Sequence, residues 1–117
     1  MTILKLTFAT LALGACLAAT PTLAETIALK ATLNAASQVP VNDSKGTGTA
    51  AVTFDTASKK LSWKVTYAGL TGPATAGHFH GPAEPGKNAG VAVPFTKVDT
   101  SPIEGSATLT DAQAADL

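Results

Sequence analysis

The sequence contains no arginine, and its eight lysines are balanced by eight acidic residues, so the formal net charge is zero. Binding to nucleic acid requires a basic patch that neutralises phosphates, and binding to an anionic membrane surface requires a similar excess of positive charge. The balance therefore argues against both partners. Cysteine is almost absent too, because Cys16 is the only one, and an intrachain disulfide is thereby excluded.

A long hydrophobic run is also missing. The apolar stretch of residues 6–19 falls short of the ~20 residues that a helix needs to span a bilayer. It follows Lys5 and precedes small residues that end at Ala24, which is the three-part pattern of a secretory signal. The sequence thus predicts a signal-peptide helix within residues 1–24, no membrane span, and a mature domain of residues 25–117 that is periplasmic or secreted.

Cys16 leaves a second route of processing open. Residues 13–16 resemble the lipobox of bacterial lipoproteins, in which the cysteine is acylated and becomes the new amino terminus. The apolar run continues past Cys16 and a better cleavage site follows at Ala24, so a lipid anchor is the less favoured reading. Cleavage at Ala24 would leave the mature chain without cysteine, and so without a thiolate metal site.

The predicted mature region fits one small domain with a modest core. Apolar and polar side chains alternate along it, the period-two pattern of strands with one buried face. The alternation is clearest around Trp63 and Tyr67, which are predicted to point inward, as are Val52 and Phe54. Six strands are predicted, at residues 26–33, 47–55, 60–67, 74–80, 91–95 and 103–109.

Turns between the strands and the start of one helix complete the predicted secondary structure. In the first strand, Ile27, Leu29 and Leu33 are predicted to share the buried side. Segments rich in glycine, proline and asparagine separate the strands, and residues 110–113 match a helix capping box. Short strands with regular turns predict an antiparallel β-sandwich or an open barrel.

The only two histidines, His78 and His80, are two residues apart. On a strand they point to the same face, while Phe79 between them points to the other, into the core. Two imidazoles so placed converge on one ion, and imidazole suits copper, zinc or nickel. The alternative is structural: one or both histidines bond to carbonyls of the glycine-rich loop at residues 81–90.

A complete zinc site has four ligands, or three and a water, so two histidines need further donors. Spacing does not choose among the candidates, which are Asp43, Glu84, Asp99, Glu104 and the mature amino terminus. A Gly-x-Ser-x-Gly hydrolase motif and a P-loop are absent, and no two carboxylates are placed as an obvious acid–base pair. The residues thus predict binding rather than catalysis.

Several motifs in order give the chain a resemblance to the CHRD domain, a module named for chordin and common in exported bacterial proteins. They span residues 29–117. The motifs are residues 33–40, Gly46-x-Gly48, Leu61-x-Trp63-x-Val65-x-Tyr67 with Gly69-Leu70, residues 76–83, residues 90–93, and Gly105-x-Ala107-x-Leu109-Thr110.

The resemblance implies an all-β, Greek-key-like sandwich. The segment around His78 and His80 is also similar to the copper-ligand strand of Cu,Zn superoxide dismutases, which implies copper as the metal, with zinc as the alternative. The dismutase pattern requires further histidines and an aspartate, so a dismutase-like enzyme is the less favoured reading. CHRD domains usually continue past the segment that ends this sequence, so the resemblance implies a C-terminally truncated domain that lacks its last strand or two and has an unpaired sheet edge.

The function predicted from the sequence is a non-enzymatic, extracytoplasmic binding domain that holds copper through His78 and His80. The alternative is a protein-interaction or matrix module without a metal.

Overall fold

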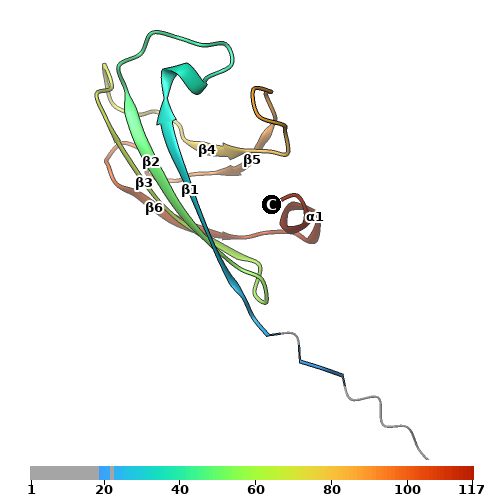
Figure 1. The fold of residues 1–117 in the computed structure, drawn as a ribbon. Helices are drawn as coiled ribbons and strands as arrows, with labels where there is room; N and C mark the ends of the chain where they lie inside the picture. Colours follow the sequence, from blue (N-terminus) through green and yellow to red (C-terminus); the bar gives the residue numbers. More distant parts are fainter. Residues whose placement is uncertain (1–18, 22) are drawn as a thin grey trace, which may run out of the picture.

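The computed structural model describes residues 19–21 and 23–117 (Figure 1). The predicted signal-peptide helix and Cys16 fall outside these residues. Within the described part of the chain, no helix is long and apolar enough to cross a membrane.

The described residues form two antiparallel sheets, a short 3₁₀ helix η1 and a short α-helix, which confirms the predicted all-β class (Figure 1). The larger sheet has the order β1-β2-β3-β6, and the smaller pairs β4 with β5. Both β4–β5 and α1 lie on one side of the larger sheet, so the domain has two layers (Figure 1). The elements are β1 (Thr26–Asn34), η1 (Ala35–Ser37), β2 (Thr47–Asp55), β3 (Lys60–Ala68), β4 (His78–His80), β5 (Val91–Pro94), β6 (Ile103–Thr108) and α1 (Asp111–Ala115).

One predicted strand is much shorter than expected. Residues 74–80 were predicted to be extended and paired, but only His78–His80 forms β4. Its partner β5 ends at Pro94, which lacks the N–H that a longer ladder needs. A single bond from the Phe95 N–H to the Gly77 carbonyl, 2.8 Å, continues the contact.

The core lies between the two layers and follows the predicted alternation. Every second residue is buried from Ala50 to Phe54 in β2 and from Leu61 to Val65 in β3, as the pattern predicts, whereas Tyr67 at the end of β3 is half-buried. Among the described residues, the buried hydrophobic side chains are Ala50, Val52, Phe54, Leu61, Trp63, Val65, Val93, Ile103 and Leu109.

The prediction of a buried face on β1 is wrong. Ile27, Leu29 and Leu33 share the side of the sheet that carries the core, yet they remain 38%, 36% and 39% exposed. The reason is position: β1 is an edge strand with a neighbour, β2, on one side only, so its core-side face is incompletely covered. Alternation identifies which side chains share a face but not whether another layer covers that face.

The predicted capping box is present at the start of α1. Gln113 N–H donates to Thr110 Oγ1 at 3.2 Å, and Thr110 N–H donates to Gln113 Oε1 at 2.9 Å. The Gln113 amide also donates to the Ala92 carbonyl in β5 at 3.0 Å. An ion pair between Lys59 and Asp111 ties the helix to the β2–β3 turn. The short helix is therefore fixed to both layers.

Candidate functional site

The strand that carries the two histidines is anchored by an aromatic cluster. Phe79 contacts Trp63 edge-on, with ring centroids 5.6 Å apart, and contacts Phe95 at 4.7 Å. Trp63 and Phe95 stack at 5.1 Å with an interplanar angle of 27°. Phe79 thus packs against the core, as predicted, and this packing fixes which way the residues on either side of it face.

The two imidazoles lie together on the face opposite Phe79. Their ring centroids are 4.4 Å apart and the ring planes are tilted by 44°. His78 is half-buried and His80 is exposed, so an ion or ligand can reach the pair from solvent. The structure therefore brings the two predicted residues into one place.

A hydrogen bond fixes the orientation of His80. Its Nδ1 lies 2.8 Å from the Ala89 carbonyl oxygen. A carbonyl only accepts, so Nδ1 carries the proton and the lone pair of the neutral ring lies on Nε2. The loop closes nearby through the Gly81 N–H and the Gly90 carbonyl, 3.2 Å apart. The sequence suggested such loop bonds in general but could not identify Ala89.

The other predicted donors do not join the pair. Across residues 19–21 and 23–117, no three His, Cys, Asp or Glu side chains gather where they could hold one ion. Glu104 pairs instead with Lys64 at 3.2 Å, on the β3–β6 ladder. Glu25, at the predicted mature amino terminus, is held by Thr56 in the β2–β3 turn. The described residues thus bring the two imidazoles together without a third side chain of these types beside them.

Comparison with known proteins adds a family to this geometry. The family model of the CHRD domain matches residues 29–117, which is most of the chain. The chain belongs to the CHRD domain family. No curated protein and no solved structure matches it. CHRD domains are found in extracellular or exported proteins, and membership points to an extracellular binding module.

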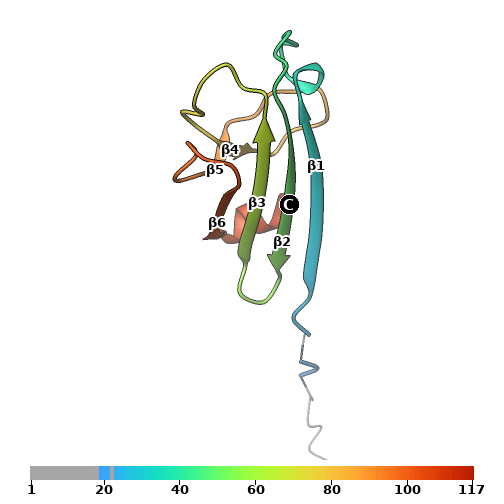
Figure 2. The ribbon, with the colours of Figure 1, turned by 90° about the vertical axis from the view of Figure 1, so that its left-hand side faces the viewer.

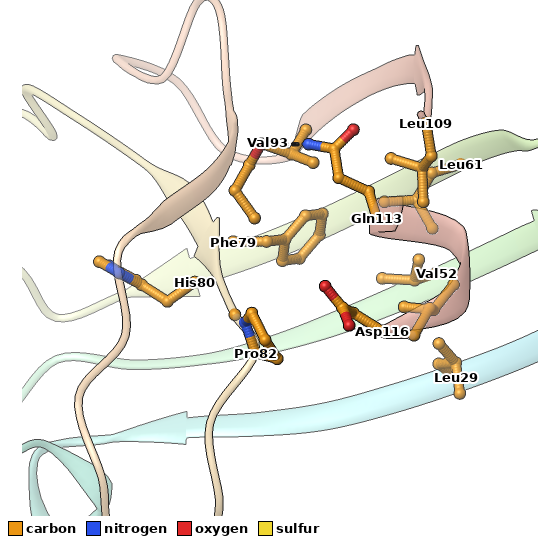
Figure 3. A pocket seen from close by; sticks show the side chains of 13 residues that line it. Leu29, Val52, Leu61, Phe79, His80, Pro82, Val93, Leu109, Gln113 and Asp116 are labelled. Atoms are coloured by element: carbon orange, nitrogen blue, oxygen red, sulfur yellow. Dashed lines mark hydrogen bonds between the residues drawn. The ribbon is translucent and has the colours of Figure 1, made fainter. Parts of the chain in front are cut away.

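This CHRD domain also has an apolar pocket that sequence reasoning missed. It has a volume of about 230 Å³ and lies between the larger sheet, the β4–β5 layer and α1. Figure 3 shows the Phe79 ring and the Asp116 carboxylate turned into it, whereas the His80 ring points away. Because segments from β1 to the last residue contribute to the lining, no local motif signals the pocket. His80 thus belongs to the lining of the pocket although its ring lies outside it, so the pocket and the histidine pair adjoin at β4.

Proposed function

We propose that this CHRD domain is a non-enzymatic, extracytoplasmic module that binds copper, with zinc as the weaker alternative, through His78 and His80. The observation that carries the proposal is the pair of imidazoles with ring centroids 4.4 Å apart on one accessible face. Imidazole nitrogen is a ligand that copper and zinc both accept, and copper binds more tightly to a given nitrogen site.

The bond between His80 and Ala89 fits this role. Histidine ligands in metal sites almost always donate their second ring N–H to a carbonyl, a carboxylate or a water, which fixes the tautomer and orients the ring. His80 makes such a bond through Nδ1, which leaves Nε2 as its ligating atom. Two protein ligands would leave positions for water or for a donor from a partner, which suits metal handling in an exported protein.

The same bond also favours a second function. His80 joins the start of the loop at residues 81–90 to its end, so the imidazole could serve only to shape that loop. The domain would then be a protein-interaction module without a metal. The two functions differ in whether removal of the imidazoles lowers the thermal stability of the protein in the presence of a chelator.

The test is calorimetric titration of Cu²⁺ and Zn²⁺ into the exported protein after treatment with chelator. We expect one copper site in the wild type and none in the His78→Ala/His80→Ala double variant. Glu84→Gln is the matched control, since it changes a charge in the adjacent loop without touching an imidazole, and it should bind as the wild type does. Binding should weaken as the solution is made acidic, because protons compete with the metal for imidazole nitrogen.

Equal copper uptake by the wild type and the double variant would contradict the proposal. The interaction module is favoured if the wild type takes up no copper and the double variant loses thermal stability in chelator. Continuous-wave electron paramagnetic resonance of the Cu²⁺ complex adds a readout. Two imidazole nitrogens give a hyperfine pattern, and the single variants His78→Ala and His80→Ala should each change it.

A further inference from the structure

The two imidazoles of β4 lie closer together than the backbone that carries them. Residues i and i+2 of a strand have Cα atoms about 6.4–6.8 Å apart, whereas the ring centroids of His78 and His80 are 4.4 Å apart. In Figure 2, β4 and β5 lie behind the larger sheet, and Phe79 points toward that sheet to contact Trp63. Both histidine rings therefore lean toward each other on the side of β4 that faces away from the larger sheet.

An irregularity in the strand pairing lies at the same place. The β4–β5 register shifts between Phe79 and His80, because Ala92 of β5 has no partner in β4. Such a bulge increases the local twist of the paired strands and re-aims side chains. The shift accounts for why the ring of His80 departs from the regular strand direction and approaches the ring of His78.

Contacts on both sides of the pair hold this arrangement. Phe79, between the histidines, is packed against Trp63 and Phe95, which fixes the backbone of β4. The Nδ1 N–H of His80 donates to the Ala89 carbonyl at 2.8 Å, so this ring is not free to turn and its Nε2 is the atom that can ligate. Because the rings are held, their separation sets the angle at which an ion between them is bound.

That angle follows from simple geometry. An ion bound at about 2.0 Å from an imidazole nitrogen lies about 3.1 Å from the centroid of that ring. Two centroids 4.4 Å apart then subtend an angle of about 90° at the ion. Tetrahedral coordination, with an angle of about 109°, requires centroids about 5.1 Å apart, and linear coordination requires about 6.2 Å. The observed spacing therefore fits an ion that takes neighbouring ligands at right angles.

We propose that His78 and His80 are a ligand pair for Cu²⁺ in tetragonal coordination, and that their spacing discriminates against tetrahedral Zn²⁺ and against Cu⁺. This inference rests on the proposed function and specifies the oxidation state and the coordination geometry of the ion. Tetragonal nitrogen sites are typical of Cu²⁺ and Ni²⁺, whereas Zn²⁺ favours tetrahedral sites and Cu⁺ with two nitrogen ligands favours a linear one. The angle concerns these two nitrogens alone, so it does not depend on what supplies the other ligands.

Other geometries require the two rings to move apart. The centroids would have to separate by about 0.7 Å for a tetrahedral ion and by about 1.8 Å for a linear one. His78 is half-buried, which limits the movement of its ring. Movement of His80 would strain its bond to Ala89, and spreading of the backbone would disturb the contacts of Phe79. The protein thus opposes these geometries, whereas free imidazoles adopt whichever angle the ion prefers.

The test compares ion preferences and not copper binding alone. Dissociation constants of the exported protein for Cu²⁺, Ni²⁺, Zn²⁺ and Ag⁺ are measured by calorimetric titration in a chloride-free buffer, with Ag⁺ as a redox-stable substitute for Cu⁺. The binding constants of two free 4-methylimidazole molecules with the same ions are the reference. We expect the preference of the protein for Cu²⁺ over Ag⁺ to exceed that of the free ligands at least about tenfold. Its preference for Ni²⁺ over Zn²⁺ should also exceed the reference, since Ni²⁺ accepts right angles.

The single variants His78→Ala and His80→Ala are the controls. Each keeps one imidazole, so no angle is imposed, and its ion preferences should equal those of one free 4-methylimidazole molecule. If the wild type binds Cu²⁺ through both histidines but with the ion preferences of the free ligands, the proposed function stands and the inference about geometry is wrong. If the wild type binds no Cu²⁺, or the double variant binds it equally well, both are wrong.

Discussion

Replacing Gly105 with alanine should destabilise the domain, because the added methyl group has no room. An alanine Cβ at this position of β6 would lie 2.6 Å from Cζ2 and 2.8 Å from Cε2 of Trp63. The indole cannot simply move away, since it is buried and stacked on Phe95 with Phe79 against its edge. Restoring ordinary contact requires a shift of about 0.8 Å by packed atoms, and well-packed cores resist such shifts.

Two opposing effects set the magnitude. Overpacking of this kind costs about 1–3 kcal/mol. The alanine also restricts the unfolded chain, which stabilises the folded state by roughly 0.4–1 kcal/mol. The net loss for Gly105→Ala is therefore expected at about 1–2 kcal/mol, a substantial part of a stability that is typically 5–15 kcal/mol. For a domain of this size, the melting temperature should fall by roughly 5–15 °C.

The assay is urea unfolding followed by fluorescence, which reports on Trp63 because it is the only tryptophan. Gly90→Ala is the matched control, since a Cβ there meets nothing within 4 Å. Its stability should equal that of the wild type or exceed it by up to about 1 kcal/mol, because only the effect on the unfolded chain remains. If Gly105→Ala is as stable as Gly90→Ala, the close packing of Gly105 against the indole does not limit the size of the side chain that this position of the core accepts.

Two further predictions concern the helix and the histidine strand. The hydrogen bond from Lys59 and the positive charge of Lys59 lower the pKa of Asp111 in the folded state. The stability that this carboxylate contributes is therefore present above about pH 4, and it is lost as the pH falls through the pKa of the folded state. Asp111→Asn should therefore lower the urea midpoint at pH 7, with the difference from the wild type vanishing toward pH 2; a constant difference would refute the linkage. Phe79→Leu should loosen β4 and raise the copper dissociation constant about tenfold in calorimetry, although both imidazoles remain; unchanged affinity would show that Phe79 does not position them.

Alternation predicted most of the fold because each strand follows a simple rule. Residues i and i+2 share a face, so the inward positions of Trp63 and Phe79 could be inferred from the pattern alone. The capping box is equally local, and Thr110 and Gln113 pair as the sequence indicates. The family assignment also agrees, since the motifs that carried it lie within the matched range.

The errors and omissions all depend on the path of the chain in space, which a local pattern does not contain. The exposure of Leu29 depends on how far the second layer extends, and periodicity contains no such information. The bond between His80 and Ala89 depends on the path of a loop rich in glycine and proline, whose conformation the composition does not determine. The apolar pocket depends on where the C-terminal residues settle against β1 and β2.

The aromatic cluster connects the core to the candidate site, and this connection distinguishes the two roles of the histidines. If His78 and His80 bind a metal, the ion binds only the folded state, in which Phe79 has placed both rings on one face, so saturating metal should stabilise the fold in proportion to the logarithm of its concentration. If His80 only holds the loop, its bond to Ala89 contributes a fixed amount that no ion alters. A melting temperature that rises with copper in the wild type, and not in the double histidine variant, is therefore compatible with the first role alone.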